Sequence, residues 1–216
     1  MAKDGRVRPE QRWPASLAGV AAVALYATLP HQMTFGPSWL APALELALLV
    51  PLTIAVPMRH PGEARWLRIA AILVIGIMSV ANIVSLALVI ESLLYGGTTI
   101  GRPLILEAMQ IWLINTLIFA LWYWELDRGG PGKRRITQHH PPDFLFPQMD
   151  TPHIASPDWR PTFVDYLYLS FTNSTAFSPT DTLPLTPWAK MLMLAQSLIS
   201  LLTVALVAAR AVNILG

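Results

Sequence analysis

Long apolar runs, separated by polar segments, constrain this chain more than any other feature of its sequence. Crossing the hydrocarbon core of a bilayer takes roughly 20 helical residues. We interpret five runs as spans: Ala15–Leu29, Trp39–Val56, Trp66–Tyr95, Pro103–Leu126 and Pro187–Leu215. The fourth run ends in Trp122-Tyr123-Trp124, which is typical of an aromatic belt at the membrane interface. The runs predict an all-α integral membrane protein with five transmembrane helices.

Composition agrees with a lipid-facing surface. Only 13% of the 216 residues are charged and 54% are apolar, whereas soluble domains carry roughly 25% charged residues. The chain contains no cysteine, which excludes a disulfide-stapled secreted module. The sequence pI is near 9.2, but the basic residues cluster between apolar runs instead of forming one basic face, so no nucleic-acid partner is expected.

The distribution of positive charge predicts an orientation. If the first four helices alternate, twelve of the fifteen Lys and Arg residues fall on one side of the membrane. They are Lys3, Arg6, Arg8, Arg12, Arg59, Arg65, Arg68, Arg128, Lys133, Arg134, Arg135 and Arg160. The positive-inside rule then predicts a cytoplasmic N-terminus in the cell inner (plasma) membrane.

The chain divides into three parts by composition. Residues 1–126 form the N-terminal membrane region, 127–160 a Pro-rich polar loop, and 161–216 a C-terminal module. Within the loop, the apolar patch Asp143–Pro147 is expected to pack back onto the membrane face or onto a neighbouring subunit. No spacing in the loop matches a metal motif, including that of His139, His140, His153, Asp143 and Asp150. No catalytic motif is present, so neither an enzyme nor a cofactor is expected.

The C-terminal module begins with a helix that is too short to cross the membrane. Thr162 and Asp165 form a capping box, which predicts a helix start. A helix over Phe163–Thr175 spans only about 20 Å. A polar Ser/Thr/Pro turn follows it, and then a full span. This order predicts a re-entrant pore-type half-helix, whose C-terminal dipole favours a cation at the turn.

The residues around the turn carry a resemblance over about 50 positions. Thr175, Asp181, Pro184, Thr186-Pro187 and Lys190 occur in an order that resembles the pore module of tetrameric potassium-type cation channels. The resemblance implies a homotetramer that conducts monovalent cations passively, because one pore loop and one inner helix cannot enclose a pore. The whole chain also resembles uncharacterised bacterial multi-span membrane proteins that share this stretch.

The filter departs from that family. Ala176 replaces its valine, Phe177, Ser178 and Pro179 replace Gly-Tyr-Gly, and Thr180 is an insertion. A carbonyl filter needs glycines that adopt positive φ, so we expect weak selectivity from side chains instead. The candidate pore and filter residues are Ser174, Thr175, Ala176, Phe177, Ser178, Pro179, Thr180 and Asp181.

The last helix carries a polar stripe. Gln196, Ser200 and Thr203 recur at spacings of four and three, which places them on one helix face. This face either lines the pore or forms hydrogen bonds between helices.

Three carboxylates at the side opposite the basic loops, Glu45, Glu91 and Glu107, form a second candidate cluster. If these carboxylates carry protons, the protein is a small proton-coupled carrier. A non-conducting scaffold or partner-binding subunit is the other alternative to a channel.

Topology adds one further alternative. The charge distribution places both flanks of the pore loop in the cytoplasm, whereas the pore loop of potassium-type channels enters from outside. Either the pore is inverted, a resemblance to ionotropic glutamate receptors, or one N-terminal run does not cross the membrane.

Overall fold

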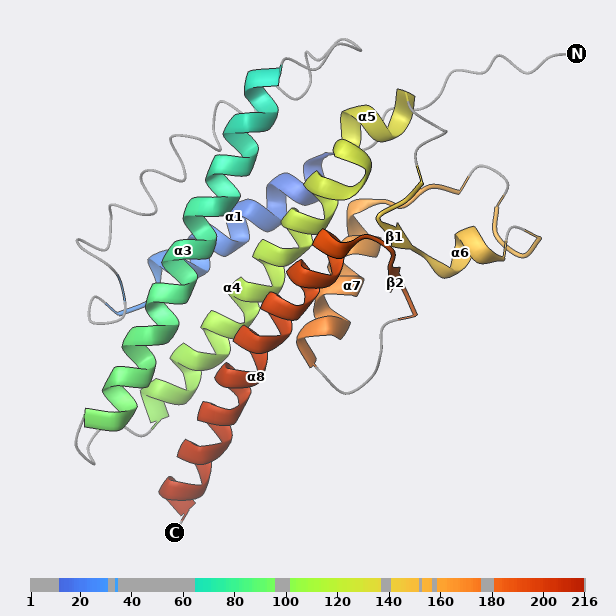
Figure 1. The fold of residues 1–216 in the computed structure, drawn as a ribbon. Helices are drawn as coiled ribbons and strands as arrows, with labels where there is room; N and C mark the ends of the chain where they lie inside the picture. Colours follow the sequence, from blue (N-terminus) through green and yellow to red (C-terminus); the bar gives the residue numbers. More distant parts are fainter. Residues whose placement is uncertain are drawn as a thin grey trace, which may run out of the picture.

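The structure, a computed structural model, describes residues 12–30, 34, 65–95, 102–136, 141–151, 153–156, 159–175 and 181–215. These parts of the chain are mostly helical (Figure 1). The longer helices are α1 (Trp13–Ala27), α3 (Arg65–Tyr95), α4 (Arg102–Leu126), α7 (Phe163–Thr175) and α8 (Pro187–Leu215). The short elements are the 3-10 turn η3 (Asp127–Gly129), α5 (Pro131–Ile136), β1 (Phe144–Leu145), α6 (Pro147–Asp150) and β2 (Leu183–Pro184).

Three of the described helices are long and apolar enough to cross a membrane. The crossing stretches are Arg68–Ser92, Ile105–Gly129 and Pro187–Ala209. They match the predicted third, fourth and last spans. α1 has 15 residues, fewer than a crossing needs. The predicted second span, Trp39–Val56, lies outside the described residues, so the count of five spans stays a prediction.

Helix α4 lies at the centre of the bundle, because α1, α3, α7 and α8 all pack against it (Figure 1). Its side chains at Ile111, Ile114 and Ile118 are almost completely buried. A helix that is covered on several sides can be apolar around most of its circumference, as this one is.

Helices α3 and α4 run antiparallel. Trp122 Nε1 donates a hydrogen bond to Ser79 Oγ at 2.8 Å. Arg68 Nε lies 3.8 Å from Glu125 Oε1, which places the start of α3 beside the end of α4. The basic residues that follow α4 and those that begin α3 therefore lie at one end of the bundle, called the basic end below.

For two of the three aromatic residues at the end of α4, the prediction of a belt at the membrane interface is wrong. Tyr123 and Trp124 are buried, because α7 and the polar loop cover this end of the helix. The Trp124 ring lies edge-on to Phe163 with centroids 6.1 Å apart. The Tyr123 ring packs against Phe144 at 5.1 Å. These rings join elements of the protein instead of marking a lipid boundary.

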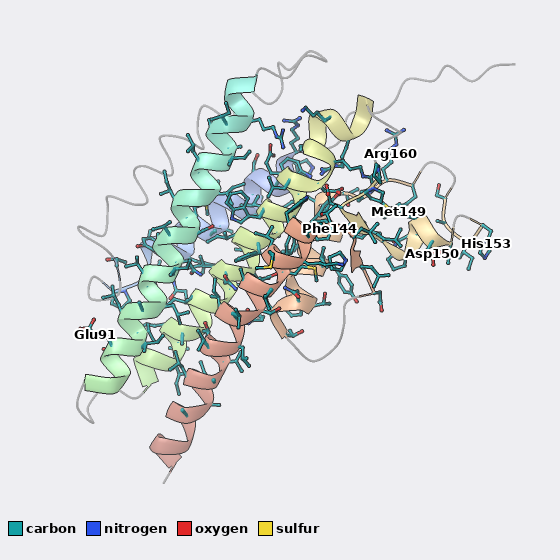
Figure 2. All side chains as sticks on the ribbon, in the orientation of Figure 1. Glu91, Phe144, Met149, Asp150, His153 and Arg160 are labelled. Carbon is teal, nitrogen blue, oxygen red and sulfur yellow. The ribbon has the colours of Figure 1, made fainter. Side chains whose placement is uncertain are left out.

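The apolar patch of the polar loop folds back onto the chain's own helices; packing onto the membrane face or onto a neighbouring subunit, as expected from the sequence, stays a prediction. The Phe144 side chain is fully buried and contacts the rings of Tyr166 and Trp188. Figure 2 shows Phe144 beside α8, with Met149 and Arg160 farther out on the loop. Strand β1 pairs antiparallel with β2, in the register Phe144 with Pro184 and Leu145 with Leu183. The loop is thus tied to the segment that precedes α8.

Candidate functional site

The short helix α7 begins where the capping box predicts. The Asp165 carboxylate accepts hydrogen bonds from the backbone N–H and the hydroxyl of Thr162, at 2.7 and 2.8 Å. Acceptors at a helix start satisfy N–H groups that have no partner within the helix. The helix ends at Thr175 after 13 residues, so its length agrees with the predicted half-helix.

Helices α7 and α8 begin at the same end of the bundle. The Phe144 ring contacts Tyr166 in the first turns of α7 at 6.5 Å. It also contacts Trp188, the second residue of α8, at 5.8 Å. Because one ring contacts both helix starts, α7 and α8 start side by side and run toward the opposite end of the bundle (Figure 1).

A buried glutamine joins the C-terminal half of α7 to α4 and α8. Gln196 of α8 is fully buried, and its amide group is hydrogen-bonded on both sides. Its oxygen accepts from the Tyr123 hydroxyl and, at 2.8 Å, from Asn173 Nδ2. Its nitrogen contacts the hydroxyls of Ser170 and Ser174 at 2.7 and 2.6 Å. We call these five residues the neutral cluster.

Helix α4 completes this polar contact. The Ser170 hydroxyl donates to the backbone oxygen of Thr116 at 2.6 Å. The Thr116 hydroxyl lies 3.1 Å from that of Ser174. Hydroxyls and amides that pair between apolar helices are the usual polar contacts in membrane bundles. Helix α7 is therefore fixed to α4 and α8 by side chains as well as by apolar packing.

The last carbonyl groups of α7 are occupied within the chain. The oxygens of Thr172, Asn173 and Ser174 accept hydrogen bonds from Thr175 Oγ1, Ser197 Oγ and Trp112 Nε1, at 2.8, 3.5 and 3.3 Å respectively. Carbonyls at a helix end carry the negative end of its dipole. Because protein donors already meet three of them, the expected attraction of this helix end for a cation is weakened.

The predicted filter lies partly within the described residues. Ser174 is buried in the neutral cluster, and Thr175 bonds its own helix. Asp181 is exposed at the end of the turn. Ala176, Phe177, Ser178, Pro179 and Thr180 lie outside the described residues.

The predicted polar stripe of α8 is on one face, and that face is turned into the bundle. Gln196, Ser200 and Thr203 are at most 1% exposed. Ser200 Oγ accepts from Asn115 Nδ2 of α4 at 3.2 Å, and Thr203 Oγ1 donates to the Ile199 backbone oxygen at 2.8 Å. Within one chain, Gln196 and Ser200 thus form hydrogen bonds between helices, which is the predicted alternative to lining the pore.

The three candidate carboxylates have different surroundings. Glu45 lies outside the described residues. Glu91 is exposed and lies at the end of the bundle opposite Arg160 (Figure 2). Glu107 is buried on α4, with 9% of its surface exposed. A shared carboxylate site therefore stays a prediction.

A charged cluster at the basic end was not predicted from the sequence. Asp127 is fully buried after α4 and accepts hydrogen bonds from the Tyr166 hydroxyl at 2.6 Å and the Asp143 backbone N–H at 3.0 Å. Two guanidinium groups, of Arg128 and Arg134, lie 3.5 and 3.9 Å from its carboxylate. We call these five residues the charged cluster. The only feature of the sequence that indicates this cluster is one acidic residue, Asp127, that directly precedes a basic segment.

Asp143 extends the charged cluster to α8. Its carboxylate accepts from the Arg128 backbone N–H at 2.7 Å and from Trp188 Nε1 at 2.9 Å. Its backbone oxygen accepts from the Leu185 N–H at 2.8 Å. One loop residue therefore connects the end of α4 with the start of α8.

Because the comparisons with known proteins give no match, the functional proposal rests on the geometry of the described residues. Among the described residues, no group of three or more His, Asp or Glu side chains is placed to hold a metal ion. No family model, curated protein or solved structure matches the chain.

Proposed function

We propose that this protein is a passive, weakly cation-selective ion channel formed by a homotetramer. In this proposal α7 is a re-entrant half-helix, the turn after it is the filter, and α8 is the inner helix. The ligands are monovalent cations, and the protein resides in the bacterial inner membrane.

The observation that carries the proposal is the common start of α7 and α8 at one end of the bundle. In this proposal α7, a 13-residue helix that packs against α4 and α8, ends at membrane depth. Irregular backbone is tolerated there only if it is buried in protein or lines a watery cavity. Assembly around an axis would supply both surroundings for residues 176–180, which favours an oligomer.

Cation preference would come from side chains at the turn. Asp181 is exposed, and four copies would place a ring of carboxylates at the mouth of the pore. Such rings favour cations over anions. Because hydrogen bonds within the chain weaken the attraction of the α7 C-terminus for a cation, we assign a larger share of the cation selectivity to Asp181.

The proposed pore loop enters from the basic end. Tyr166 near the start of α7 bonds Asp127 after α4, and Arg68, Arg128 and Arg134 lie at this end. By the positive-inside rule this end faces the cytoplasm. The pore would then be inverted relative to potassium-type channels.

Ion flux through purified protein in liposomes tests the proposal. We expect wild-type protein to conduct monovalent cations, and Asp181→Asn to lose most of the flux or its cation preference. Asp150→Asn is the matched control, because Asp150 is also an exposed aspartate but lies in α6. Absence of flux from a well-folded oligomer with several cations would contradict the proposal.

A non-conducting scaffold is the second candidate, and one observation favours it. The polar stripe of α8 forms hydrogen bonds within the chain. The exposed face of this helix is apolar, with Leu194, Leu198 and Leu201 about half exposed. An apolar axis can close a pore by dewetting. Flux that stays absent in Leu198→Ser, which adds a hydroxyl to this face, would support the scaffold over a closed channel.

A further inference from the structure

The polar loop holds the segment that leads from the turn after α7 into α8. In this segment β2 pairs antiparallel with β1 of the loop (Figure 1). The side chains of Leu183 and Leu185 are 55% and 44% exposed, so they bury only part of their surface against the protein. Backbone pairing with β1 therefore helps to fix this segment.

Asp143 connects the segment to the end of α4. Its backbone oxygen accepts from the Leu185 N–H at 2.8 Å, and its Oδ1 accepts from Trp188 Nε1 at 2.9 Å. Its Oδ2 accepts from the Arg128 N–H at 2.7 Å, and its own N–H donates to Asp127 Oδ1 at 3.0 Å. Both carboxylate oxygens and both backbone groups are thus hydrogen-bonded, which gives Asp143 one defined orientation.

Asp181 lies close to this connection in the sequence. It precedes β2 by two residues, and the Thr182 side chain between them is buried. The Asp181 side chain is exposed. Its position is therefore coupled through a short piece of backbone to β2, and through β2 to the polar loop.

We propose that Asp143 and Trp188 are positioning residues for Asp181, through which the polar loop regulates the cation selectivity of the pore mouth. This inference rests on the proposed function, because Asp181 acts on ions only in a channel. A ring of carboxylates favours cations through the field at its centre, and this field falls as the carboxylates move outward. A displacement of the loop thus changes selectivity without a change in the residues of the mouth.

Trp188→Phe tests the inference, because it removes the N–H that Asp143 accepts and keeps an aromatic ring against Phe144. The readout is a spin label on Asp181→Cys, in a chain that contains no native cysteine. Loss of one hydrogen bond shifts a local equilibrium roughly fivefold, so we expect the ratio of mobile to immobile label to rise by that factor. Trp159→Phe is the matched control, since its ring packs against Phe146 of the same loop. It should leave the label unchanged.

Flux in liposomes is the second readout, measured on chains that retain Asp181. We expect Trp188→Phe to lower the ratio of cation to anion permeability, whereas a purely structural hydrogen bond would lower only the melting temperature. Leu145→Cys with Leu183→Cys then gives a rescue, because the two residues are paired and paired Cα atoms, about 5.5 Å apart, suit a disulfide. Oxidation of this pair should restore the ratio in Trp188→Phe, and reduction should lower it again.

The two readouts separate failure of the inference from failure of the channel. Wild-type flux, together with an unchanged label and an unchanged permeability ratio in Trp188→Phe, would overturn the inference alone. A label that becomes mobile in Trp188→Phe, without flux from the wild type, would contradict the channel and support the positioning of Asp181 by the loop.

Discussion

The neutral cluster and the charged cluster attach the same short helix to the bundle with different chemistry. In the C-terminal half of α7, Gln196 of α8 is surrounded by hydroxyl and amide groups that carry no formal charge. At the start of α7, Tyr166 bonds the Asp127 carboxylate, which two guanidinium groups approach. Ionised groups are costly at membrane depth, whereas neutral polar groups are tolerated when paired. If the bundle spans a membrane as proposed, position along the membrane normal would decide which kind of polar contact can hold α7.

Loss of the Asp127 carboxylate should have the largest effect on stability. We expect Asp127→Ala to lower the free energy of unfolding by about 3–5 kcal/mol, because a buried guanidinium, that of Arg134, loses the carboxylate beside it. Denaturant titration in detergent micelles, followed by circular dichroism, measures the change. Asp150→Ala in exposed α6 is the control and should be nearly neutral. A loss smaller than the one expected for Gln196 would break the comparison.

The central amide of the neutral cluster should rank second. We expect Gln196→Leu to cost about 1–3 kcal/mol, because buried hydroxyls on α7 lose their partner. The same denaturant titration measures it. Leu198→Ala, at an exposed position of the same helix, controls for a change in α8. If Gln196→Leu is neutral or stabilising, apolar packing alone holds α7 at this depth.

A single hydroxyl of the neutral cluster should rank third. Tyr123→Phe removes one donor to Gln196 while keeping the ring against Phe144, so we expect a loss of about 1 kcal/mol. Tyr168→Phe is the matched control, since Tyr168 lies on α7 with 58% of its surface exposed. Equal melting temperatures for the two variants would contradict the role of the buried hydroxyl.

The contact between α4 and α8 should show the smallest effect. Ser200→Ala removes the acceptor of Asn115 Nδ2, and hydrogen bonds between membrane helices average about 0.6 kcal/mol. A double-mutant cycle with Asn115→Ala isolates the pair. A coupling energy near zero would mean that the hydrogen bond adds nothing to the packing of α4 against α8.

Local signals predicted the helices well. The predicted Trp66–Tyr95, Pro103–Leu126 and Phe163–Thr175 agree with α3, α4 and α7 within one residue. Long apolar runs and a capping box are encoded by neighbouring residues, so they can be recognised without knowledge of the fold. The first run was less informative, because α1 is short and Ala-rich.

Long-range contacts could not be predicted in this way. The spacing of Gln196, Ser200 and Thr203 gave a common face but not its partner, since that depends on how α4 and α7 pack. The bonds from Asp127 to Tyr166 and from Asp143 to Trp188 join residues 39 and 45 positions apart. The composition of the polar loop gave no sign that β1 pairs with β2.

Cysteine labelling tests most directly whether α7 re-enters the membrane, and the chain is suited to it because it contains no cysteine. Single variants Asp150→Cys, before α7, and Lys190→Cys, in the first turn of α8, are treated in oriented vesicles with a membrane-impermeant maleimide. Lys133→Cys at the basic end gives the reference side. The account predicts that all three positions are labelled from the same side. Labelling of Asp150→Cys and Lys190→Cys from opposite sides would mean that α7 crosses the membrane, and would contradict the proposed pore.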